Sequence, residues 1–210
     1  MLVLILFPNM PWLRKLERNA YSLESILGKA GIEPLDTKYH KPNYEIGGII
    51  VPELNWNPYV TKDGKKHFYQ RELCWTLSDE RSFIDSIYHS IQCGTIIMRE
   101  HSWEYLEKEI AAGNTDVAFH DIVDGKQRLN TLRRFLNDEF TDNQGNYWTD
   151  LSERAQWTFL DSKSLGFAML RQNSTDEDTL QTFLSVNFTG KPMSKQHIKF
   201  VQSIATLFIK

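Results

Sequence analysis

The apolar residues of this chain follow two different spacings, which together predict a mixture of helices and strands. Apolar positions three or four residues apart, as in an amphipathic helix, recur over residues 11–30, 78–94, 152–161, 175–187 and 194–210 and in the segment after Gly125. Short runs typical of strands occur at 46–56, 95–100, 117–123 and 165–170. Because the two kinds of segment do not alternate strictly, their order favours an α+β fold with a small sheet over a doubly wound parallel sheet.

Local signals predict where several of these segments begin and end. Asp63-Gly64 is the commonest hairpin turn pair and predicts two short strands within 57–71. Gly94 is expected to end the helix over 78–94, and Trp157 and Leu160 are expected to face inward on the helix over 152–161. Side chains that can accept a hydrogen bond from a helix's first turn predict N-caps at Ser78, Thr175 and Ser194.

Residues 1–45 are predicted to form a strand and helix extension with a linker, and residues 46–210 to form the main domain. The opening run MLVLILF has no basic residue before it, and Pro8 and Pro11 break the sequence that follows. A signal peptide has a basic start and a longer apolar run, and a membrane span needs about 20 apolar residues. We therefore expect a buried strand or docking segment here and no membrane partner.

The charge of the chain limits how it can contact nucleic acid. Its net charge is −3, so any DNA contact depends on a local basic patch. Lys62, Lys65, Lys66 and His67 surround the predicted hairpin turn and form one such patch. A solvated edge hairpin is the simpler interpretation of the same residues.

The cysteines and histidines show no spacing typical of a metal site. Cys74 and Cys93 do not form a C-x-x-C pair, which indicates reduced thiols and a cytoplasmic location. The six histidines are scattered along the chain, and as a set they fit solvated or capping roles better than metal ligation.

The most informative stretch is the passage from strand to helix in DIVDGKQRLNTL. A helix N-terminus presents unpaired N–H groups and about half a positive charge, and Gly125 allows an anion to approach them closely. Arg128 would add a planar fork for phosphate, Asp124 could hold Mg²⁺ through water, and Gln127 could orient a water or a phosphate oxygen. In the alternative interpretation Asp-Gly is only a turn, Asp124 caps the helix and Arg128 pairs with a surface acid.

Four blocks in order support the first interpretation: YQRELCW (69–75), SIYHSIQCGTII (86–97), IVDGKQRLNTL (122–132) and VNFTGKPMSKQHI (186–198). Together they resemble the N-terminal domain of GmrSD-type modification-dependent restriction endonucleases, over about residues 46–200. That family belongs to the ParB/sulfiredoxin-like superfamily, which implies a small mixed sheet flanked by helices with a nucleotide at the strand-to-helix corner.

The resemblance transfers roles to individual residues. Its DGQQR motif falls on 124–128, its upstream QR pair on Gln70 and Arg71, and its N-x-x-G on Asn187 and Gly190. It implies catalytic roles for Asp124 and Gln127, with Asp124 also at the metal. It implies phosphate or nucleotide binding by Gln70, Arg71, Gly125, Lys126, Arg128, Asn187 and Gly190.

This sequence departs from the family pattern in three places. Lys126 stands where the motif has glutamine, Met193 replaces a leucine, and the segment 53–68 is longer than expected. The lysine adds a positive charge at the centre of the motif and leaves that position's role open. The methionine is a tolerable core exchange.

The resemblance implies a nucleotide-binding domain that hydrolyses nucleoside triphosphates with Mg²⁺ and regulates a nuclease. We expect no nuclease activity from this chain itself. We expect a standalone version that acts with a separate nuclease, is encoded by a phage or mobile element, and is concerned with phage defence. The alternative is a non-catalytic module that binds DNA or a protein and retains the fold. The base and the partner are not readable from the residues.

Overall fold

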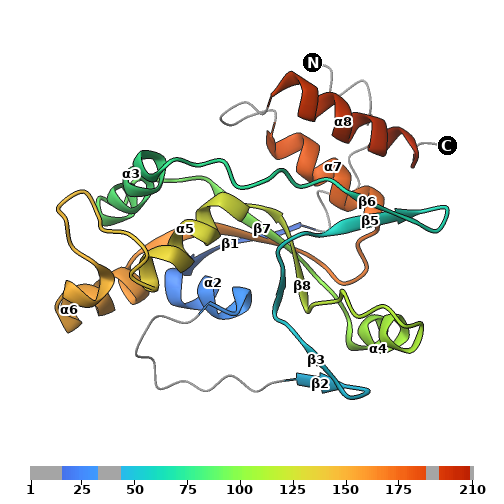
Figure 1. Ribbon diagram of the computed structural model, residues 1–210, viewed down its shortest axis with the longest axis horizontal. Helices are drawn as coiled ribbons and strands as arrows, with labels where there is room; N and C mark the ends of the chain where they lie inside the picture. Colours follow the sequence, from blue (N-terminus) through green and yellow to red (C-terminus); the bar gives the residue numbers. More distant parts are fainter. Residues whose placement is uncertain (1–15, 33–43, 188–193, 209–210) are drawn as a thin grey trace.

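The computed structural model describes residues 16–32, 44–187 and 194–208, and Figure 1 shows a central sheet with helices on both sides of it. The sheet has five strands in the order β1-β9-β7-β8-β4. In that order their bounds are β1 Leu16–Ser22, β9 Ser164–Leu170, β7 Thr95–Glu100, β8 His120–Asp124 and β4 Leu54–Asn55.

The sheet is mixed in strand direction. β1 runs antiparallel to β9, β9 runs parallel to β7, β7 runs antiparallel to β8, and β8 runs parallel to β4. With helices against it, this arrangement confirms the predicted α+β class and the small mixed sheet. The predicted strands over 95–100 and 165–170 are confirmed as β7 and β9, whereas β8 begins three residues later than predicted.

Consecutive strand residues point into two cores, one on each face of the sheet. On β7, Ile96 and Met98 lie in one core and Ile97 lies in the other, as the two-residue period of a strand requires. The helices of the first core are α2 (Leu23–Ala30), α3 (Leu77–Tyr88) and α5 (Lys126–Leu136). Those of the second are α7 (Asp176–Asn187) and α8 (Lys195–Thr206). Because helices cover both faces of the sheet, the sequences of the central strands are nearly continuous runs of apolar residues.

Two hairpins and one further helix lie at the edge of this body. The hairpins pair β2 (Tyr44–Ile46) with β3 (Ile49–Val51) and β5 (Tyr59–Lys62) with β6 (Lys65–Phe68), and the helix is α4 (Trp103–Ala111). Asp63 and Gly64 have φ values of 50° and 72°, so the predicted hairpin turn is confirmed. Helix α4 was not predicted; its Leu106 packs in a small core of its own with Ile46 and Val51.

The N-terminal part of the prediction needs correction. Residues 16–22 form strand β1, and within 11–30 the described helix covers only Leu23–Ala30. The reason is long-range: β9 pairs with β1 along its whole length, and local apolar spacing does not report such a partner. β1 and α2 therefore belong to the main sheet and its core, although they precede residue 46. The run MLVLILF and most of the expected linker lie outside the described residues.

Two other segments differ from prediction for local reasons. The single strand over 46–56 is three short strands, because Gly47 and Gly48 turn the chain back with φ values of 57° and 82°. Helix α3 begins after Thr76, not Ser78, because Thr76 and Asp79 form a reciprocal capping box. It ends at Tyr88, well before Gly94.

The C-terminal helices follow their caps more closely. Thr175 Oγ1 accepts from Asp178 N at 3.1 Å and Ser194 Oγ from His197 N at 3.2 Å, which confirms both predicted N-caps. In the segment 152–161, α6 (Glu153–Trp157) continues into a π-helical turn at Thr158–Ser162. Trp157 is 61% exposed, contrary to the prediction, because the wider turn changes the face that points inward. Leu160 packs partly buried against the first core, as predicted, and Phe159 is fully buried.

Within the described ranges, no helix combines the length and apolar character that a bilayer crossing requires.

An ion pair holds the end of α5 against α3. Arg134 Nη1 lies 2.5 Å from Glu80 Oε2, and the Glu80 residue is only 3% exposed. Arg134 Nε also reaches Glu139 at 2.9 Å. Arg134 thus points away from the 124–128 corner, as expected for a residue more than a turn further along the helix.

Replacing Arg134 with alanine should therefore destabilise the fold, because it leaves the Glu80 carboxylate buried without its cation. We expect the free energy of unfolding to fall by about 3 kcal/mol, the cost of breaking a buried pair on one side. Urea denaturation measures it. Arg133→Ala is the control: Arg133 is exposed above the Trp56 ring, and its loss should cost about 1 kcal/mol or less. Equal losses for both variants would contradict this role of Arg134.

Candidate functional site

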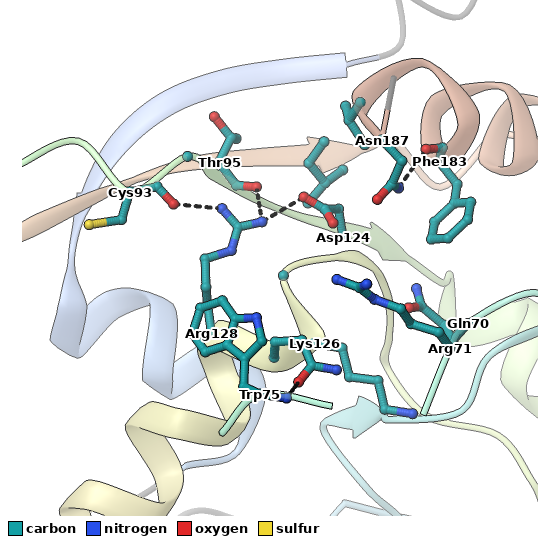
Figure 2. A pocket seen from close by; sticks show the side chains of 15 residues that line it. Gln70, Arg71, Trp75, Cys93, Thr95, Asp124, Lys126, Arg128, Phe183 and Asn187 are labelled. Atoms are coloured by element: carbon teal, nitrogen blue, oxygen red, sulfur yellow. Dashed lines mark hydrogen bonds and ion pairs between the residues drawn. The ribbon is translucent and has the colours of Figure 1, made fainter. Parts of the chain in front are cut away.

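A cavity of about 520 Å³ opens where β8 ends and α5 begins. Figure 2 shows side chains from distant parts of the chain converging on it. Its lining brings together all but one of the predicted site residues: Gln70, Arg71, Asp124, Gly125, Lys126, Gln127, Arg128 and Asn187. The exception, Gly190, lies outside the described residues.

Gly125 forms the corner itself. It is the N-cap of α5 with φ +103°, a conformation that L side chains rarely adopt, and a Cβ there would lie 3.0 Å from Ile96 Cγ1. No side chain caps the first turn of α5. The alternative in which Asp124 caps the helix is therefore wrong, and the first-turn N–H groups remain available to an anion at the cavity.

The Arg128 guanidinium is bound on two sides (Figure 2). Nη1 donates to Cys93 O at 2.9 Å, and Nη2 donates to Thr95 O at 3.1 Å and to Asp124 Oδ2 at 2.5 Å. These contacts tie the first turn of α5 to the start of β7. The partner acid of Arg128 is thus its own motif's Asp124, and both side chains are mostly buried.

Gly94 makes room for this guanidinium. A Cβ at Gly94 would lie 2.5 Å from Arg128 Nη1, and the residue has φ +84°. Its role is therefore to let the backbone approach Arg128, and not to end a helix as the sequence predicted.

Two glutamine amides hold the segment that carries Arg71. Gln127 Oε1 accepts from Cys74 N at 3.1 Å and Trp75 N at 3.2 Å, while its Nε2 donates to Glu72 O at 3.0 Å. Gln70 Nε2 donates to Ile122 O and Val123 O of β8 at 2.9 and 2.8 Å. Residues 70–75 have no regular secondary structure, so these bonds position them at the cavity.

Two cations face the cavity without a carboxylate partner in the described structure. The Arg71 side chain extends into the cavity in Figure 2, and it makes no ion pair with a described residue. Lys126 Nζ donates to the neutral amide oxygen Asn57 Oδ1 at 2.6 Å. Burial lowers the pKa of the Lys126 ammonium, since the residue is only 8% exposed.

Aromatic and amide groups complete the wall. The Trp75 ring lines the cavity and packs edge-on against Phe83, with ring centroids 5.5 Å apart. Asn187 Nδ2 donates to Phe183 O at 2.7 Å, and both residues line the cavity from α7. The lining therefore combines apolar rings and amide groups with the cationic side chains.

Sequence reasoning did not assign the roles of Cys93, Gly94 and Thr95. They lie in the block SIYHSIQCGTII, which the sequence had already indicated as part of the motif set. Only the fold shows that the carbonyl groups of Cys93 and Thr95 accept hydrogen bonds from Arg128. It also missed a buried pair elsewhere, His101 Nε2 with Asp121 Oδ2 at 2.7 Å. Neither His101 nor His120 is solvated, contrary to the prediction for the histidines as a set.

The fold and site together define an α+β domain with a cavity at an uncapped helix N-terminus. A family model described as the GmrSD restriction endonuclease, N-terminal domain, matches residues 62–201 of the 210. The chain belongs to this family, which confirms the predicted resemblance. No curated protein and no solved structure gives a significant match.

Gly94→Ala should test whether this site depends on the position of Arg128. The new Cβ must displace the guanidinium, which breaks bonds to Cys93, Thr95 and Asp124. Gly113→Ala is a matched control, because Gly113 also has φ +84° but open space around its Cβ position. We expect Gly94→Ala to lower the free energy of unfolding by about 1–3 kcal/mol more than the control, measured by urea denaturation. Equal losses would show that only backbone strain matters.

Proposed function

We propose that this domain binds a nucleoside triphosphate in the cavity at the β8–α5 corner and hydrolyses it to regulate a nuclease partner. The observation that carries the proposal is the convergence of an uncapped helix N-terminus with the cations Arg71 and Lys126 in one cavity. Oriented N–H groups and unpaired cations are what a phosphate chain needs. Membership of this restriction endonuclease family supports a DNA or nuclease partner.

The roles of the motif residues follow from their contacts. Arg71 would bind phosphate directly, and the Gly125 corner would receive an oxygen at its backbone. Arg128 and Gln127 are positioning residues in this proposal, because their polar groups already bind the protein. Gln70 likewise holds Arg71's segment against β8.

Asp124 is the carboxylate in the cavity lining, so it is the group that would orient an attacking water. Its Oδ2 accepts a hydrogen bond from Arg128, which fixes the orientation of the carboxyl group. The Mg²⁺ that the resemblance implies fits these residues poorly, and no step of the proposed reaction depends on it.

The hairpin patch offers less support for direct DNA binding. Lys66 Nζ already bonds Asn114 and Asp116, each at 3.2 Å, and Lys62 lies over the Phe208 ring. These contacts fit the solvated hairpin interpretation, and we assign the patch no ligand. If no nucleotide binds, the non-catalytic interaction module becomes the better function.

Nucleotide binding should appear as a rise in melting temperature, because a ligand of the folded state stabilises it by mass action. ATP, GTP, CTP and UTP are screened separately at about 1 mM. We expect at least one to raise the melting temperature of the parent. Arg71→Ala should weaken its binding by about 1.5–3 kcal/mol, the value of a charge-assisted bond. Arg154→Ala, at an exposed site on α6, is the control and should bind like the parent. No shift with any nucleotide contradicts the proposal.

Hydrolysis is tested separately with Asp124→Asn, which keeps the shape and one acceptor for Arg128. We expect phosphate release to fall by at least about tenfold while nucleotide affinity changes little, since orienting water matters most in the transition state. A colorimetric phosphate assay and calorimetry measure the two quantities. Parallel loss of affinity and turnover would make Asp124 a purely structural residue.

A further inference from the structure

The cavity offers a divalent cation few ligands. Mg²⁺ is held by oxygen ligands, usually one or two carboxylates together with substrate phosphates. Asp124 is the sole carboxylate among the described residues of this lining, and Arg128 Nη2 already lies 2.5 Å from its Oδ2. In the described part of the chain, no group of three or more His, Cys, Asp or Glu side chains could hold a metal. A metal ion at Asp124 would have to displace or approach a guanidinium of like charge.

The same lining instead supplies positive charge from side chains. Arg128 and Asp124 offset each other, which leaves the charges of Arg71 and Lys126. The lining therefore carries two net positive charges, as much as one Mg²⁺ would bring. Among the described residues, Arg71 is the only one of these four groups whose side chain makes no polar contact, and it extends into the cavity (Figure 2).

Lys126 is the residue that sets this chain apart. It stands where the resemblance leads one to expect glutamine, and it is buried beside the corner. Its ammonium donates to the neutral Asn57 amide and forms no ion pair with a described acid. The Glu72 carboxylate acts on this charge only from beyond ion-pair distance, so it offsets it in part. A charge in a poorly hydrated site acts more strongly on a nearby anion than one in water.

We propose that this domain binds its nucleoside triphosphate without a divalent cation, with the Lys126 ammonium and the Arg71 guanidinium neutralising the phosphates in place of Mg²⁺. This inference rests on the proposed function, since it concerns how the same cavity takes the same ligand. It makes Lys126 a residue that determines metal dependence. A chain with glutamine at this position would have one less cation and a greater need for the metal.

The experiment compares nucleotide affinity with and without metal. The four common ribonucleoside triphosphates are titrated into the parent protein by calorimetry, once in EDTA and once in excess Mg²⁺. We expect the nucleotide that binds to show dissociation constants within about threefold of each other in the two buffers. Lys126→Gln should lose about tenfold in affinity in EDTA, the size of one charge-assisted bond, and Mg²⁺ should restore most of the loss.

A control separates the charge of Lys126 from the fold and from general electrostatics. Lys108→Gln removes a lysine from the exposed side of α4 and should leave both dissociation constants unchanged. Lys126→Arg keeps the charge and should remain independent of Mg²⁺. The melting temperature of each apo variant shows whether Lys126→Gln still folds. If it does not fold, metal independence is tested by comparing the dissociation constants in EDTA and in Mg²⁺ for the parent and for Lys126→Arg.

The outcomes distinguish this inference from the proposed function. Binding by the parent in Mg²⁺ but not in EDTA overturns metal independence and leaves nucleotide binding intact. Binding by Lys126→Gln in EDTA as tight as the parent overturns the role of Lys126. Absence of binding by the parent in both buffers overturns the proposed function itself.

Discussion

The site depends on one guanidinium, that of Arg128, which joins the backbone at 93–95 to the strand-to-helix corner at 124–128. It donates to the carbonyl groups of Cys93 and Thr95 and pairs with Asp124, one turn before it on the other side of Gly125. The strand-to-helix corner therefore cannot move independently of the start of β7. A lysine could not make these contacts, because a single ammonium lacks the planar fork that reaches separate acceptors. The close approach of Gly94 is the steric consequence of the same arrangement.

The two glutamines extend this order to a segment with no secondary structure of its own. Gln70 binds the last carbonyl groups of β8, and Gln127 binds the backbone of 72–75 from the first turn of α5. Between these two attachments lies Arg71, whose side chain is left to the cavity. Most of the motif's polar residues therefore form hydrogen bonds within the protein and build a rigid frame. Few of its groups remain for a ligand. Such preorganisation lowers the ordering cost of binding.

Lys126 adds a positive charge beside this frame. It occupies the first position of α5 and extends toward Asn57, on the loop between β4 and β5. Among the described lining residues, Arg71 and Lys126 form no ion pair, and the carboxylate of Asp124 is engaged by Arg128. This charge balance is the electrostatic basis of the proposed preference for an anionic ligand.

The sequence by itself determined the α+β class, the hairpin at Asp63-Gly64, the caps at Thr175 and Ser194 and the helix after Gly125. Each of these depends on neighbouring residues, through turn conformation, capping or apolar spacing, so local information suffices. It also placed Gln70, Arg71, Asp124 and Asn187 at one site, because their order matched a known set of motifs. Only the tertiary structure decided that residues 16–22 are a strand, since β9 supplies the partner from more than a hundred residues away. Likewise, whether Arg128 and Gln127 meet a ligand or the protein depends on which backbone groups the fold brings within hydrogen-bond distance, and no local pattern encodes that proximity.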